Sequence, residues 1–168
     1  QSPLPEGRAI VFQGNSASTA IFDPLNLSFN PSANLPETLG AGASSFRIST
    51  GAHGGKVLTI LGKTDNTTGK TYLYDPMTNR YSAGTPLTSG MAQRGVHFNN
   101  RVSKKLHLYS RNDAYVHAYD ANNLAWTIVG PSVPDADPPV VAHLTQGSEV
   151  FTVILRQSST TLYTHGTN

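Results

Sequence analysis

The sequence predicts an all-β fold made of four repeated antiparallel units. A turn motif flanked by aromatic residues recurs three times, apolar stretches of strand length precede each copy, and no segment keeps the apolar spacing of an amphipathic helix between two caps. The 168 residues include 15 Gly and 11 Pro and only 13% charged residues, a composition typical of short strands joined by turns. The length suits one domain, which we place over residues 1–168.

The recurring motif is an aromatic residue, then Asp, then a polar turn, then a second aromatic residue seven positions after the first. It occurs as Phe22-Asp23 to Phe29, Tyr74-Asp75 to Tyr81, and Tyr119-Asp120 to Trp126. Because Asp side chains accept hydrogen bonds from turn amides, we interpret these carboxylates as hairpin-turn residues and not as catalytic groups. The Asp positions are 52 and 45 residues apart, which is close to the length of a four-stranded unit.

Two further sets of apolar segments complete the predicted units. A strand before each hairpin is predicted at Arg8–Phe12, Lys56–Leu61, Lys105–Tyr109 and Val150–Leu155. An additional strand before these is predicted at Ser45–Ser49, Gly95–Phe98 and Val140–Leu144. The units therefore cover roughly residues 7–38, 44–88, 92–134 and 139–168, with three, four, four and three strands.

Two of these units resemble kelch repeats. One match runs from Arg94-Gly95-Val96-His97 through Lys104–Tyr109 to Trp126, and the other runs from Gly54-Gly55 to Tyr81. The resemblance covers nearly the whole chain, as two complete and two partial repeats, although Gly62-Lys63 and Ser110-Arg111 stand where kelch repeats have a Gly-Gly pair. It implies a β-propeller of radially arranged four-stranded blades, as in the central domain of galactose oxidase. Kelch propellers usually have more blades than this chain supplies.

The two ends of the repeat array are incomplete. The first unit lacks its innermost strand, and the last unit lacks its outermost strand. An open sheet edge presents unpaired backbone groups that favour pairing with another strand. We therefore expect a kelch-like β-propeller of about four blade units that is short or incomplete at the seam. Three-stranded blades or strands from another chain would complete it.

Composition excludes several classes of function. A net charge of +2 is too small to hold phosphate backbones, so we expect no nucleic-acid partner, and no apolar run is long enough for a membrane span. The kelch family also contains copper radical oxidases, which need a tyrosine crosslinked to a cysteine. The absence of Cys from this chain excludes that cofactor. The six His residues form no dense ligand motif. We expect no catalytic residue, no metal site and no cofactor.

The candidate ligand site is one position on the innermost strands. An alignment of these strands places Arg47, His97 and His143 at one position in successive units, where the resemblance implies that they line a central channel. Three polar side chains there could bind an anion or another polar ligand. The alternative is structural, because a His at this place in kelch repeats can form a hydrogen bond with the backbone of a neighbouring blade.

Two features favour a secreted or cell-surface protein. Asn26 and Asn66 begin N-glycosylation sequons, and the chain opens at Gln1-Ser2-Pro3, as a chain does after removal of a signal peptide. These observations leave three functional hypotheses. The first is a non-catalytic propeller that binds another protein chain or forms a homo-oligomer. The second is a carbohydrate-binding propeller with loop aromatics such as Tyr115 stacked on a glycan. The third is a degenerate oxidase-type enzyme that uses the channel position.

Overall fold

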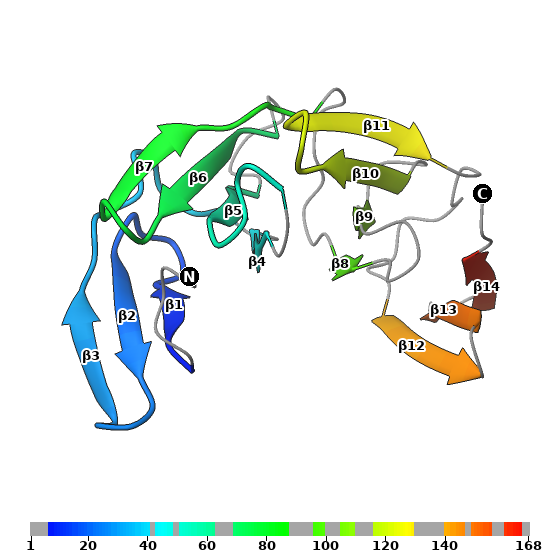
Figure 1. Ribbon diagram of the computed structural model, residues 1–168, viewed down its shortest axis with the longest axis horizontal. Helices are drawn as coiled ribbons and strands as arrows, with labels where there is room; N and C mark the ends of the chain where they lie inside the picture. Colours follow the sequence, from blue (N-terminus) through cyan, green and yellow to red (C-terminus); the bar gives the residue numbers. More distant parts are fainter. Residues whose placement is uncertain are drawn as a thin grey trace.

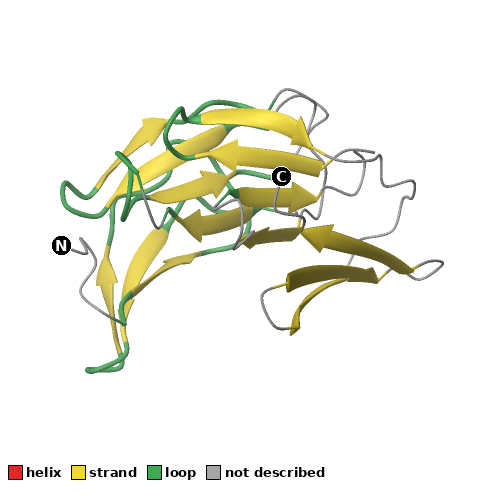
Figure 2. Ribbon diagram, turned by 45° about the vertical axis from the view of Figure 1, so that its right-hand side comes forward, coloured by secondary structure: helices red, strands yellow, loops and turns green. Residues whose placement is uncertain are grey.

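The fold is all-β, as the sequence predicts. The computed structural model describes residues 7–40, 43–48, 51–62, 69–87, 96–99, 105–109, 116–129, 140–146, 149–155 and 160–165. Within these ranges the regular structure consists of strands (Figure 2). None of the described residues forms a helix that could cross a membrane.

The described strands form four antiparallel sheets in which sequence neighbours pair. The first sheet contains β1 (Ala9–Phe12), β2 (Thr19–Asp23) and β3 (Ser28–Pro31). The second contains β4 (Ser44–Arg47), β5 (Val57–Ile60), β6 (Thr71–Asp75) and β7 (Arg80–Ala83). The third contains β8 (Val96–Asn99), β9 (Leu106–Tyr109), β10 (Val116–Asp120) and β11 (Ala125–Val129). The fourth contains β12 (Val140–Gln146), β13 (Glu149–Leu155) and β14 (Thr160–His165).

The predicted count of three, four, four and three strands is thereby confirmed for the described residues. The four sheets follow one another along an arc, with β1, β4, β8 and β12 on its inner side (Figure 1). The first and fourth sheets lie at opposite ends of this arc and do not meet, so the sheets do not close into a ring as a complete propeller would (Figure 1).

The predicted Asp turns are confirmed by their hydrogen bonds. The Oδ1 atoms of Asp23, Asp75 and Asp120 each accept a bond from the backbone N–H two residues later, at 3.0, 2.9 and 2.9 Å. A basic residue directly before β1, β5 or β9 also contacts each carboxylate. The pairs are Arg8–Asp23, Lys56–Asp75 and Lys105–Asp120, at 2.8, 3.5 and 4.0 Å. These carboxylates therefore join neighbouring strands of one sheet, which is a structural role.

The main core lies between the second and third sheets. Its buried residues are Phe46, Ile48, Leu58, Ile60, Leu73, Leu87, Leu106, Leu108, Tyr119 and Trp126. A smaller cluster between the first and second sheets is built on Leu35, Leu39 and Leu61, with Phe12 and Tyr72 packed against it. Among the described side chains, burial therefore decreases from this interface toward the first sheet.

Candidate functional site

The strand register shows which of the three predicted channel residues occupy equivalent positions in their sheets. Arg47 pairs with Val57, and His143 pairs with Thr152. Each of these partners pairs on its other side with a Tyr. Val57 pairs with Tyr74, and Thr152 pairs with Tyr163. Arg47 and His143 therefore occupy matched positions on β4 and β12, and the Arg47 side chain is exposed.

His97 does not share that position. It pairs with Leu108, two residues beyond Leu106, which is the partner of the first aromatic residue in its unit. The matched position on β8 belongs to Asn99, which pairs with Leu106. The alignment differs from the register here because connections of unequal length separate the innermost strands from the aromatic motifs. The side chains of His97 and His143 lie outside the described ones, so a shared ligand site remains a prediction.

The paired aromatics of the hairpins form a second repeated feature. The ring centroids lie 5.1 Å apart in Phe22–Phe29, 5.0 Å in Tyr74–Tyr81 and 4.8 Å in Tyr119–Trp126. All three pairs are tilted and join directly paired residues of neighbouring strands. Similar geometry at matched positions indicates that each pair presents an equivalent aromatic surface on its sheet.

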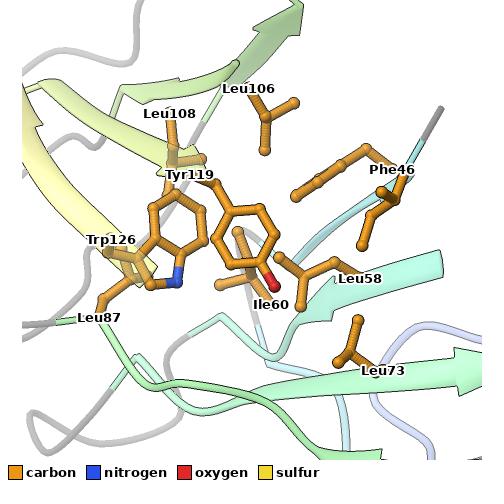
Figure 3. Packing of buried hydrophobic residues seen from close by; sticks show 10 residues of the cluster. Phe46, Leu58, Ile60, Leu73, Leu87, Leu106, Leu108, Tyr119 and Trp126 are labelled. Carbon is orange, nitrogen blue, oxygen red and sulfur yellow. The ribbon is translucent and has the colours of Figure 1, made fainter. Parts of the chain in front are cut away.

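In the second and third units this aromatic surface packs against the preceding unit. Tyr119 lies edge-on to Phe46 of the second sheet, with centroids 6.1 Å apart, and Trp126 is only 6% exposed (Figure 3). Tyr74 is fully buried, and its hydroxyl lies 3.1 Å from the hydroxyl of Ser32, which follows the first sheet. The second and third aromatic pairs thus contact the unit before their own.

No described sheet precedes the first one, so its aromatic pair has no such cover. Phe29 keeps 64% of its surface exposed, and Val11 keeps 40%. The register places these residues on one face with Ala9, Phe22 and Pro31, because Ala9, Phe22 and Phe29 form one row and Val11 aligns with Pro31 two positions along. We call this set the first-sheet face. It is an apolar surface whose counterparts in the second and third units are covered.

The sequence contains a signal for this surface. Phe29 occupies the position of Tyr81 and Trp126, and Val11 lies on the same side of its strand as Ala9. Alternation predicts that such residues are buried when a unit precedes them. In the first unit, the same pattern marks an uncovered face.

A cavity of about 280 Å³ lies between the first and second sheets. Phe12, Leu39 and Ala43 give it apolar walls, and Ser45 and Thr59 are among its other lining residues. Thr59 is 1% exposed, and its hydroxyl has no hydrogen-bond partner in the described structure. A buried hydroxyl without a partner is unfavourable unless a ligand or water molecule satisfies it. The cavity could therefore hold a small polar molecule.

One predicted glycosylation site can be located. Asn26 is exposed in the turn between β2 and β3, where its amide lies 3.4 Å from the Asp23 carboxylate. Asn66 and Tyr115 lie outside the described residues. Among the described residues, no group of three or more His, Asp or Glu side chains could hold a metal ion.

Comparisons with known proteins show the fold alone. No family model and no curated protein matches the chain. Its solved structural neighbours include an auxiliary nutrient binding protein from Bacteroides ovatus, with a TM-score of 0.57 and 11% sequence identity. The similarity covers 91% of this chain and 37% of that protein, so the chain spans little more than a third of its neighbour's length.

Proposed function

We propose that this chain is a non-catalytic, kelch-like propeller module that binds another protein or assembles with itself. The observation that carries the proposal is the first-sheet face, where Phe29 is 64% exposed although its counterpart Trp126 is 6% exposed. A contiguous exposed apolar surface is uncommon on monomers and marks interaction sites. Aromatic side chains at such sites supply much of the binding energy.

Comparison of two exposed apolar positions tests this proposal. Phe29→Ser removes the most exposed aromatic ring of the first-sheet face, whereas Ile128→Ser changes a residue of β11 that is 52% exposed and lies on a different sheet. Immobilised native protein should retain its binding partner, whether a second copy or another protein. The Phe29 variant should lose that partner and the Ile128 variant should keep it. Equal retention by both variants would exclude the first-sheet face as the binding surface.

We also propose a secreted or cell-surface location. It is supported by the two sequons, one of which places Asn26 in an exposed turn. Protein from its native source should lose mass after glycosidase treatment. The Asn26→Gln variant should lose less mass than the native protein on this treatment. If the mass of the native protein does not change, the sequons are not glycosylated.

A second candidate function is carbohydrate binding, and the cavity beside Thr59 favours it. Its lining combines apolar walls with hydroxyl side chains, which suits a small uncharged polyol. The solved neighbour's description as a nutrient binding protein agrees with a ligand-binding role.

Calorimetric titration with a panel of neutral monosaccharides tests this candidate. Binding by the native protein that Thr59→Val weakens at least tenfold would support it, because the substitution removes a buried polar group at nearly constant volume. Ser82→Ala, on exposed β7 away from the cavity lining, is the control. Absence of binding, or equal affinity in the Thr59 variant, would eliminate the cavity as a sugar site.

A further inference from the structure

We infer that the cavity between the first and second sheets binds a small neutral polyol that holds these two sheets together, at the position where a leucine side chain joins the second sheet to the third. This inference rests on the carbohydrate-binding function proposed above and states what the bound ligand does. It follows from equivalent positions in two interfaces, from one buried hydroxyl and from the elements that line the cavity.

Thr59 and Leu108 occupy equivalent positions in their sheets. Each lies two residues after the partner of the first aromatic residue in its hairpin. Leu108 is fully buried in the cluster between the second and third sheets (Figure 3). Thr59 is 1% exposed and lines the cavity between the first and second sheets together with Phe12. The second interface therefore contains a leucine side chain at the point where the first has a shorter, hydroxylated one.

The cavity combines one unsatisfied polar group with an uncharged lining. The Thr59 hydroxyl has no partner in the described structure, and a buried hydroxyl left unpaired is unfavourable. None of the described residues that line the cavity has an ionisable side chain, so a charged ligand would be buried there without a counter-charge. The volume of about 280 Å³ is roughly nine times the share of one water molecule in the liquid, ~30 Å³. These properties favour a neutral ligand with several hydroxyl groups and enough carbon surface to cover Phe12 and Leu39.

Both sheets contribute to the cavity, and the segment that connects them forms part of its wall. The end of β1 lines it from the first sheet, β4 and β5 line it from the second, and Leu39 and Gly40 belong to the connecting segment. The backbone N–H of Leu39 donates to the carbonyl of Ser16 in the first unit at 3.1 Å. The backbone N–H of Gly40 donates to the carbonyl of Leu61 in the second unit at 2.8 Å. A ligand that contacts all three elements stabilises the packed arrangement of the two sheets, because binding favours the state that offers the complete site.

Hydrogen exchange with and without sugar tests whether the ligand joins the two sheets. The probe is the member of the neutral monosaccharide panel that the native protein binds most tightly. In its presence, exchange of the Leu39 and Gly40 amides should slow more than exchange of the amides of β10 and β11, which lie away from the cavity. Equal slowing at both places would indicate general stabilisation and would overturn the inference.

Substitutions of Thr59 test whether the ligand takes the place of a leucine side chain. Thr59→Leu introduces the residue of the second interface, so it should raise the thermal midpoint of the unliganded protein and prevent sugar binding. Thr59→Ser keeps the hydroxyl and should reduce the affinity by less than about tenfold, which is the loss expected from one hydrogen bond. Thr127→Leu makes the first change at an exposed position of β11, and it should affect neither the thermal midpoint nor the affinity.

The possible outcomes separate this inference from the carbohydrate-binding function. Sugar binding that Thr59→Leu retains, or that leaves exchange of the Leu39 and Gly40 amides unchanged, would overturn the inference and leave carbohydrate binding at another site standing. Absence of binding by every sugar of the panel would overturn both. If Thr59→Leu does not fold, hydrogen exchange in the native protein and the affinity of Thr59→Ser still decide between these outcomes.

Discussion

Single side chains of this protein act mainly at its turns. Asp23 is the most buried of the three turn carboxylates, and Arg8 binds it through Nε at 3.0 Å and through a second guanidinium nitrogen at 2.8 Å. Burial on its own raises the pKa of Asp23, but the hydrogen bonds from Arg8 and from the backbone N–H of Leu25 outweigh it. The net pKa lies below its ordinary value of 3.8. The folded state therefore favours the charged form of this carboxyl.

The lowered pKa predicts a pH-dependent contribution to stability. A carboxyl group with a lowered pKa stabilises the folded state above its unfolded pKa of 3.8, and this stabilisation is lost as pH falls through the folded value. Asp23→Asn keeps an acceptor for the turn and removes the charge. Thermal unfolding should show the native protein to be the more stable near neutral pH, with a difference that shrinks below pH 3.8. A difference independent of pH would contradict this assignment.

Backbone conformation at the turns is a second effect at this scale. Leu27, Asn79 and Leu124 end equivalent turns with φ of 49°, 51° and 50°. This left-handed region is unfavourable for Leu and well tolerated by Asn. The second unit thus has a suitable residue at a position where the other two carry strain.

Leu27→Asn should therefore stabilise the fold. Leu27 is 79% exposed, so the substitution loses little burial, and the relief of backbone strain should add about 0.5–1 kcal/mol to the free energy of unfolding. Urea denaturation measures this gain. Leu25→Asn is the control, because Leu25 is exposed in the same turn without a positive φ, and it should show no such gain. Equal effects of the two changes would refute the strain argument.

At the scale of strands and hairpins, threonine hydroxyls attach one element to the next. The Oγ1 of Thr19 donates to the carbonyl of Ala33 at 2.5 Å, and that of Thr71 donates to the carbonyl of Thr85 at 2.8 Å. Both bonds span fourteen residues and begin at the first residue of β2 or β6. The Thr85 carbonyl also accepts a bond from Trp126 Nε1 at 3.1 Å, which joins the second unit to the third.

The same substitution at two buried threonines should have different effects. Thr71→Val removes a hydrogen bond inside the protein and should lower the free energy of unfolding by about 1 kcal/mol. Thr59→Val removes a hydroxyl that has no described partner, so it should be neutral or stabilising in the absence of ligand. Chemical denaturation of both variants tests the comparison. A larger loss at Thr59 would show that its hydroxyl is already satisfied.

The hairpins were the most predictable elements, because their signals are local. Asp and the flanking aromatics lie within a few residues of one another, and their alternation sets the faces of two adjacent strands. The innermost strands were less predictable. Their register depends on pairing across longer connections of unequal length, so the shared position expected for His97 belongs to Asn99.

At the scale of the molecule, the described side chains are most deeply buried between the second and third sheets. A cluster of ten buried residues joins the second and third sheets, while the first sheet keeps Val11 and Phe29 exposed. The cost of a core substitution should therefore depend strongly on its place along the arc.

Leu58→Ala should be among the most damaging single changes. Leu58 is fully buried between two sheets, and truncation of a buried Leu typically costs about 2–5 kcal/mol. Leu25→Ala, at an 87% exposed position, should change the free energy of unfolding by less than about 0.5 kcal/mol. Equilibrium unfolding in urea measures both. Similar costs at the two positions would mean that the central interface does not hold the fold together.

The all-β class, the hairpins and the strand count of each unit follow from the amino-acid sequence alone. These properties depend on alternation and turn chemistry over short stretches of chain. Which sheet faces are covered became visible in the folded structure. Phe22–Phe29 and Tyr119–Trp126 follow the same local pattern, yet one pair borders an uncovered face and the other packs on the second sheet. The difference arises because burial of a sheet face depends on the presence of a neighbouring sheet, which no local pattern encodes.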